Sequence, residues 1–329
     1  MNRFYLTCGL LLVLFAILTL VVGEIPFASV WQGVQERFFG ESTRWNPLLD
    51  ERLPRLIVIL CTGASLAVSG AVMQALFQNP LASPSVLGIS CGGCLLVIPI
   101  FIFQLHTQFP FVVPAAAFSG CLLTLGAVYS LSRVQGQVHV GSLILTGIAV
   151  STLLLAIQGA LLYVLRDRWQ LIQLVTEWIA GSTADRTWTH VHMQLPLTLL
   201  GLAGCWIYRQ ELNVLSLGDE EACNLGVEVR VVRWRLMLCV ALLTGGAIAA
   251  VGMVAFYGLV LPHIVRKVWG ADCMKLIPFC MLAGATAFVG IDLALRVLGL
   301  HTLSIGNVSA LLGGCFFLFL LTEKRRVYA

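Results

Sequence analysis

Residues 56–77 read LIVILCTGASLAVSGAVMQALF and contain no charged side chain. A helix needs about 20 mostly apolar residues to cross the hydrocarbon core of a membrane, so this stretch is long enough by itself. It also begins a longer run without Asp, Glu, Lys or Arg that ends at Ser132. Similar runs occupy 4–23, 134–165, 236–265 and 297–322. The pattern predicts an all-α polytopic membrane protein.

The composition supports this prediction and argues against other classes. Of the 329 residues, 59% are apolar and 11% are charged, and the mean hydropathy is +0.92. Soluble domains carry about 25% charged residues, so a soluble protein of this kind could not cover its surface. The net charge of +4 comes from arginines in connecting segments, which set orientation in membrane proteins. The sequence contains no basic stripe with interleaved aromatic residues, so it does not predict a nucleic-acid partner.

Polar or proline-containing joints divide the apolar runs into about ten spans within one domain, residues 1–329. The expected spans are 4–23, 56–77, 86–105, 111–132, 142–165, 189–208, 234–251, 253–268, 275–296 and 303–322. The first run lacks a small-x-small cleavage site, so we expect it to be retained as a span. The distribution of Lys and Arg favours a cytoplasmic position for both termini.

Small residues and cysteines inside the spans are expected to serve helix packing. Gly63, Ala67 and Gly70 are spaced so that neighbouring membrane helices can approach closely. Most of the eleven cysteines lie in apolar runs, where Cys acts as a small hydrophobic residue. The pair Cys91 and Cys94 lacks the polar, electropositive setting of a redox site, so packing is the preferred interpretation. We expect no metal site and no cofactor bound by this chain.

The sequence contains no nucleotide-binding motif, which bears on the energy source. Neither GxxxxGK[ST] nor GxGxxG after a strand occurs, and HExxH is also absent. An ion-coupled carrier would place acidic groups at mid-membrane, whereas the one acidic residue within a span is Asp292, near a helix end. We therefore expect a non-enzymatic protein driven by an ATP-hydrolysing partner that binds ATP and Mg²⁺. A stand-alone ion-coupled secondary transporter is the alternative.

The segment of about 209–233, after the sixth span, has the features of a short capped helix on a loop. Ser216 or Asp219 could cap its start, and acidic residues at 220 and 221 suit its positive N-terminal end. Gly226 fits the left-handed position that ends a helix. Basic residues follow at 230, 233 and 235. The segment predicts either a rigid lever for a partner or an ordinary amphipathic surface helix.

Three arginines, Arg52, Arg55 and Arg296, are expected near the outer ends of two spans. Long basic side chains at such positions usually reach toward the interface, and Asp292 with Arg296 could form a pair four residues apart on one helix. Arginines also suit bidentate contacts with carboxylates. They could therefore dock the carboxylates of a soluble partner.

Blocks of sequence from the second to the last span resemble FecCD-type permeases of bacterial importers for iron chelates and cobalamin. The matching blocks are Arg52-Leu-Pro-Arg55, Gly63-Ala64, 69–74 (SGAVMQ), 79–84 (NPLASP), 87–89 (LGI), 145–148 (LTGI), 178–181 (WIAG), 217–218, Ala222, 225–226, 256–266 (FYGLVLPHIVR), 292–296 and 310–320 (ALLGGCFFLFL). The blocks from 256 and from 310 are long and unbroken. Only about the first fifty residues lack a motif.

The resemblance implies a type II ABC importer permease with ten helices in the bacterial inner membrane. Its partners would be a second permease, identical or paralogous, two ATPase subunits and a periplasmic substrate-binding protein. By this resemblance, the residues that dock the binding protein are Arg52, Arg55 and Arg296. The residues of the coupling segment on the ATPase are Gly218, Asp219, Ala222, Leu225 and Gly226. The cytoplasmic gate residues are Asn79, Pro80, His139, Val140, Gly141 and Ser142.

Two departures from the family pattern bear on the cargo and on the last span. The family has Leu-Pro-(Val/Ile)-Gly before the last span, whereas this chain has 303–306 (LSIG). The segment 139–142 lacks the hydroxyl-rich residues of the cobalamin permease. We expect an iron–siderophore complex as cargo, with heme or a corrinoid as the alternatives.

Overall fold

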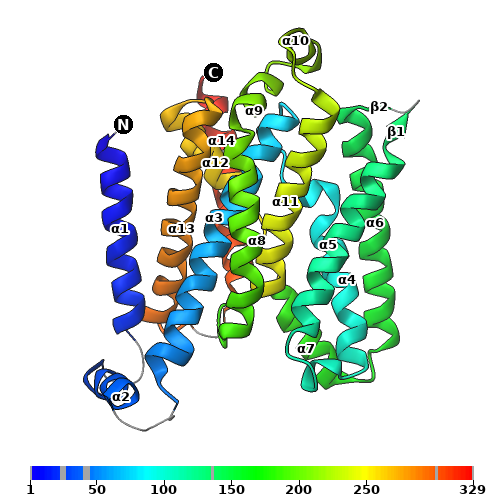
Figure 1. Cartoon of the computed structure of the whole chain (residues 1–329). Helices are drawn as coiled ribbons and strands as arrows, with labels where there is room; N and C mark the ends of the chain where they lie inside the picture. Colours follow the sequence, from blue (N-terminus) through cyan, green and yellow to red (C-terminus); the bar gives the residue numbers. More distant parts are fainter. Residues whose placement is uncertain (1, 23–26, 40–44, 135–136, 301–302, 328–329) are drawn as a thin grey trace.

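The computed structural model describes all residues except 1, 23–26, 40–44, 135–136, 301–302 and 328–329. The described chain is a bundle of roughly parallel and antiparallel helices, with one hairpin of two-residue strands (Figure 1). The long helices are α1 (Asn2–Val21), α3 (Leu53–Leu76), α4 (Ile89–Ile102), α5 (Val112–Leu131), α6 (Val140–Val164), α8 (Trp188–Ile207), α11 (Val229–Val251), α12 (Tyr257–Trp269), α13 (Cys273–Val297) and α14 (Ile305–Val327). Each expected span overlaps one of them, which confirms the all-α polytopic fold.

Shorter elements cap the two ends of the bundle (Figure 1). One end holds α9 (Arg209–Leu215), α10 (Asp219–Asn224) and the strands β1 (Arg133–Val134) and β2 (Gln137–Val138). We call this the α10 end; α1 begins at it and α14 ends at it. The opposite end, the α7 end, holds α2 (Phe27–Phe39) and α7 (Trp169–Ala180). One-turn helices at Leu48–Arg52, Pro84–Leu87 and Leu105–Thr107 complete the described elements.

The helices differ in how well they could cross a membrane. In the described part of the chain, five helices are long and apolar enough, and α8 with α9, bent by 60°, forms a sixth candidate. Three shorter apolar stretches cover Tyr5–Val21, Ile89–Ile102 and Ile305–Leu320. Helix α12 is shorter than the expected span, because residues 252–256 before it are not helical and both Gly252 (φ 87°) and Phe256 (φ 61°) have positive φ. Its 13 residues rise about 20 Å, less than the roughly 30 Å hydrocarbon core.

Helix α3 forms the centre of the bundle. In the most apolar 18-residue stretch of the span Leu48–Leu76, which contains α3, 89% of the residues are buried. Its glycines allow backbone contact with two neighbours: a Cβ on Gly63 would lie 2.4 Å from the Gly284 carbonyl oxygen, and one on Gly70 only 1.5 Å from that of Gly258. Side chains cannot occupy such space, so the close packing expected from the small residues is confirmed.

Candidate functional site

The segment after α8 carries the short helix that the sequence predicted. The chain bends by 60° into α9, and α10 begins at Asp219 with Gly218 as its N-cap. The capping prediction was wrong, because the Ser216 hydroxyl donates to the Asn213 carbonyl and the Asp219 carboxylate pairs with Arg233. Gly218, at φ 131°, makes the turn that a side chain at this position would strain.

The end of α10 follows the prediction closely. Gly226 adopts φ 82°, which confirms the left-handed position expected for it. Ala222 is fully buried under the helix, whereas Leu225 is 64% exposed. The helix therefore rests on the bundle through Ala222 and presents an apolar side chain to its surroundings. Such a side chain can contact a partner protein.

The predicted gate residues after α3 lie in an exposed turn at the α10 end. Gln78 has φ 48°, and the Asn79 amide N–H donates to the Gln74 carbonyl oxygen at 3.1 Å. The Asn79 side-chain oxygen accepts from the Leu81 amide at 2.9 Å. Pro80 lies within this turn and is exposed. The turn is thus fixed by its own hydrogen bonds.

The second predicted gate segment is partly helical, which the sequence did not predict. His139 is the N-cap of α6, and Val140, Gly141 and Ser142 form its first turn. The Ser142 hydroxyl donates to the Ser132 carbonyl oxygen at 2.8 Å and holds α6 to the end of α5. Between them, β1 and β2 pair in antiparallel register. The expected span began only at residue 142, so residues 139–141 were expected to lie before the helix.

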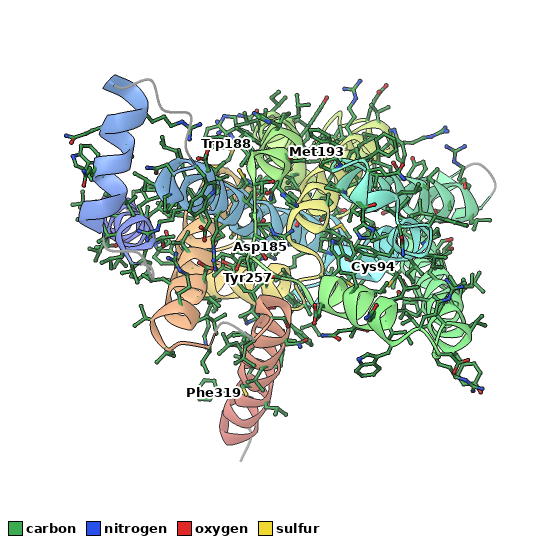
Figure 2. The ribbon with its side chains drawn as sticks, turned by 90° about the horizontal axis from the view of Figure 1, so that it is seen from below. Cys94, Asp185, Trp188, Met193, Tyr257 and Phe319 are labelled. Atoms are coloured by element: carbon green, nitrogen blue, oxygen red, sulfur yellow. The ribbon has the colours of Figure 1, made fainter. Side chains whose placement is uncertain are left out.

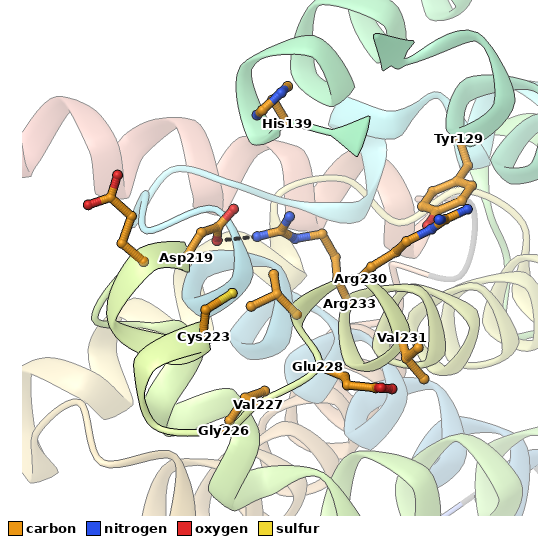
Figure 3. Close-up of a pocket in the computed structure, with 12 residues that line it drawn as sticks. Tyr129, His139, Asp219, Cys223, Gly226, Val227, Glu228, Arg230, Val231 and Arg233 are labelled. Carbon is orange, nitrogen blue, oxygen red and sulfur yellow. Dashed lines mark hydrogen bonds and ion pairs between the residues drawn. The ribbon is translucent and has the colours of Figure 1, made fainter. Parts of the chain in front are cut away.

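The coupling segment and His139 line one cavity (Figure 3). Its volume is about 920 Å³. The lining residues include Tyr129 of α5, Gly226 after α10 and Arg230 of α11. The Asp219–Arg233 ion pair lies at this cavity, as the dashed line in Figure 3 shows. The fold therefore brings together two regions that the sequence had separated by about eighty residues.

At the α7 end, two of the three predicted docking arginines hold the end of α1. One Arg52 guanidinium nitrogen donates to the carbonyls of Leu20 and Val21, at 2.8 and 3.1 Å. Arg296 donates to the carbonyls of Thr19, at 3.1 Å, and Val22. The last carbonyls of a helix have no partner within the helix. The two arginines supply those partners and fix α1 against α3 and α13.

The third arginine, Arg55, is paired across the bundle. Its guanidinium lies 2.7 Å from Asp292 and 3.3 Å from the Thr183 hydroxyl. Thr183 in turn donates to the same Asp292 oxygen at 2.6 Å. Asp292 therefore pairs with Arg55 of α3 and does not form the pair with Arg296 that the sequence suggested as one alternative. Docking of a partner by the three arginines stays a prediction.

A further arginine at the α7 end was not singled out from the sequence. Arg186, between α7 and α8, donates to the carbonyls of Ala184 and Ala250, both at 2.7 Å. Burial lowers the pKa of Arg186 to about 10, so the side chain stays charged at neutral pH. It lines a second cavity of about 780 Å³, with Trp178 and His190. An isolated arginine in a connecting segment gives no sequence pattern from which these contacts could have been predicted.

The cysteines are free thiols, and most are buried. Cys94 of α4 and Cys121 of α5 are fully buried, and a Cβ on the adjoining Gly93 would lie 2.8 Å from the Cys121 sulfur. These contacts agree with a packing role. Among the residues described, no group of three or more His, Cys, Asp or Glu is placed to hold a metal ion.

Sequence comparison matches nearly the whole chain to a transport family. The model of the FecCD transport family matches residues 9–323. The hemin transport system permease protein HmuU of Yersinia pestis is 36% identical, over 97% of this chain and 96% of its own length. The Fe(3+) dicitrate transport system permease protein FecD of Escherichia coli is 33% identical, over 94% and 95%. The vitamin B12 import system permease protein BtuC of Vibrio vulnificus is 36% identical, over 96% and 92%.

Comparison with solved structures agrees. A structure described as an inward-facing conformation of a metal-chelate type ABC transporter superposes with a TM-score of 0.84 at 28% identity, over 98% of this chain and 99% of the other. A complex of PsaBC from Streptococcus pneumoniae with a Fab gives a TM-score of 0.56 at 17% identity, over 89% and 94%. The second match bears on the fold alone.

Proposed function

The chain belongs to the FecCD transport family, and from that premise we propose that it carries an iron–siderophore complex from a binding protein across the bacterial inner membrane. Like its curated relatives, it is a transmembrane permease of the ABC importer class and is not an enzyme. ATP would be hydrolysed by a separate partner. One arrangement carries the proposal: α3 connects the predicted docking arginines, Arg52 at its N-cap and Arg55 in its first turn, to the predicted gate turn with Asn79 that follows it.

The proposed mechanism is alternating access. ATP-driven closure of two partner ATPases would move α10 and the segment around it, and this movement would rock the helices that line a central path. Such a movement needs something that binds two states with different affinity, and ATP on the partner supplies it. The cavity supports the proposal, because His139, a predicted gate residue, and the predicted coupling segment both line it.

The cargo path is proposed to lie between two permeases, identical or paralogous. In the most apolar 18-residue stretch of α6, only 11% of the residues are buried within this chain. Helix α14 exposes Leu311 and Leu318. Figure 2 shows α14 projecting at the edge of the molecule, with Phe319 on it. Apolar faces of this extent on two helices can be covered by a second permease as well as by lipid.

The orientation proposed places the α10 end in the cytoplasm, where the ATPase is, with both termini on that side. The α7 end would then face the periplasm, where Arg52, Arg55 and Arg296 would receive carboxylates of the binding protein. Because Arg52 and Arg296 also hold α1, docking at this surface would act directly on the position of that helix.

Heme and corrinoid are the alternative cargoes within the same family. The relatives' names include hemin, Fe(3+) dicitrate and vitamin B12. A different class, the stand-alone ion-coupled transporter, would need an acidic group free to bind a proton or an ion within the membrane. The buried Asp292 is already paired with Arg55, which favours the ATP-driven importer.

Reconstitution tests the proposal. Purified alone in liposomes, the chain should hydrolyse no ATP and concentrate no chelate under an imposed proton or sodium gradient. Addition of its ATPase and a binding protein loaded with a ferric siderophore should start uptake, and a hydrolysis-deficient ATPase should abolish it. Parallel assays with heme and cobalamin decide the cargo. Uptake driven by an ion gradient without the ATPase would overturn the importer assignment.

A further inference from the structure

Helices α9 and α10 are attached to the bundle in different ways. Leu212 and Leu215 of α9 are buried, and the Leu215 carbonyl accepts from the Gln78 side chain of the gate turn at 3.3 Å. Asn213 donates to Asp272 at 2.9 Å and accepts from the Cys273 amide at 2.7 Å, at the start of α13. Helix α9 is thus held to both α3 and α13.

Helix α10 has few contacts of its own. Ala222 is its one buried residue. Glycines with positive φ flank the helix, Gly218 at 131° and Gly226 at 82°. Because glycine imposes little conformational restraint, both flanking positions can act as hinges. With one buried side chain between two glycines, α10 needs a further contact to transmit a displacement to the bundle.

The Asp219–Arg233 ion pair supplies the missing attachment. Asp219 is the first residue of α10, and its side chain is 44% exposed. Arg233 lies in the second turn of α11, and its side chain is only 4% exposed. An arginine–carboxylate contact is directional and stronger when one partner is shielded from water. The pair therefore fixes the start of α10 to a buried side chain of the neighbouring helix.

Helix α11 continues from this pair to the other end of the molecule. It runs unbroken from Val229 to Val251, and 78% of the residues in its most apolar 18-residue stretch are buried. At its far end, the carbonyls of Ala250 and Val251 accept from Arg186 and from the Ser182 amide, at 2.7 and 2.8 Å. A displacement of α11 would thus reach the segment between α7 and α8.

We propose that Asp219 and Arg233 form the joint through which α10 moves α11, and that both are positioning residues for coupling ATP hydrolysis to transport. The inference rests on the proposed function and adds residues to it: Arg233, and Gln78 as the second attachment through α9. Movement of α10 would act on α11 through the ion pair, and movement of α9 would act on α3 through Gln78. The outer segment at 182–186 and the gate turn after α3 would both respond when the two short helices move together.

The test measures cargo transported per ATP hydrolysed in liposomes that contain the permease, its ATPase and the loaded binding protein. Asp219→Asn should lower this ratio by about fivefold or more, the range of a typical coupling energy. Arg233→Lys keeps the charge and should retain most of the ratio. Arg230→Gln is the matched control, because Arg230 is an exposed arginine on the same helix that lines the same cavity.

Assembly is measured in the same samples, by co-purification of the ATPase with each variant. If Asp219→Asn assembles normally and retains the wild-type ratio, the joint is refuted. An equal loss in Arg230→Gln would also overturn it, since the effect would then be one of general charge. Absence of uptake by the wild-type complex would instead contradict the proposed function, so the two failures are distinguishable.

Discussion

The Arg55 guanidinium of α3 lies 2.7 Å from the Asp292 carboxylate of α13, and Asp292 is 1% exposed. The pair joins two helices that also touch through backbone at Gly63 and Gly284. Thr183 from the segment before α8 donates to the same carboxylate. A charge at this depth is favourable only because its partners are in place.

Replacing Asp292 by Asn should destabilise the protein. The substitution removes the negative charge of the group that accepts hydrogen bonds from Arg55 and Thr183. A hydrogen bond to a charged group contributes about 1.5–3 kcal/mol to the free energy of unfolding. Thermal unfolding in detergent should therefore shift downward. Asp167→Asn is the control, because the Asp167 side chain is 93% exposed and lies 3.9 Å from Arg166; it should change stability little. Equal midpoints for the two variants would contradict the structural role of the pair.

The attachment of α1 gives a second prediction. Arg52→Gln combined with Arg296→Gln removes the guanidinium donors from the last carbonyls of α1. A helix end without such partners frays. Hydrogen exchange of a peptide covering 16–22 should become faster in the double variant and stay unchanged in Arg37→Gln, a more exposed arginine paired with Asp50. Unchanged exchange in the double variant would show that α1 is held by its apolar contacts.

Docking is tested at the same two positions. Arg52→Glu combined with Arg296→Glu should weaken binding of the substrate-binding protein by about 2–5 kcal/mol, because it reverses charges opposite carboxylates. The double Gln variant is the matched control, since it also loses the α1 contacts but does not reverse the charge. Binding measured at low salt should follow the order wild type, Gln, Glu. If the Gln and Glu variants bind alike, the arginines act only by anchoring α1.

The sequence predicted the fold more completely than the contacts of the site. Charge-free runs and proline joints specify where helices can cross a membrane, so the ten helices were expected. The 13 residues of α2, Phe27–Phe39, were not recognised as a helix, because an amphipathic helix lacks the long apolar run that marks a span. Gly226 was predicted correctly because a left-handed helix end has a local signature.

Long-range partners were beyond the sequence for a physical reason. Arg55 and Asp292 are 237 residues apart in the chain, and Asp219 reaches Arg233 only because α10 folds back beside α11. The sequence suggested local partners instead, an N-cap for Asp219 and Arg296 for Asp292. Local spacing identifies which side chains can pair within a helix, whereas these pairs are set by how helices pack together.

Helix packing itself is open to test at Gly70. A Cβ at this position would lie 1.5 Å from the Gly258 carbonyl oxygen, so α3 and α12 would have to separate. Gly70→Ala should therefore destabilise the protein by more than the about 1–3 kcal/mol typical of overpacked cores. Gly126→Ala is the control, because nothing lies within 4 Å of its Cβ position. Equal yield and thermal stability of the two variants would contradict the contact.

The last prediction concerns Gly226, which ends α10 at φ 82°. A β-branched residue resists positive φ, so Gly226→Val should distort the turn that connects α10 to α11. Nothing lies within 4 Å of its Cβ position, so the effect comes from the backbone conformation and not from a clash. Gly226→Asn is the matched control, because Asn tolerates the left-handed region. In the reconstituted complex, Val should reduce uptake and the ATP hydrolysis linked to it, while Asn retains most of both. Normal insertion and thermal stability of both variants would confirm that the permease folds. Full transport by the Val variant would show that the geometry of this turn is not required for coupling.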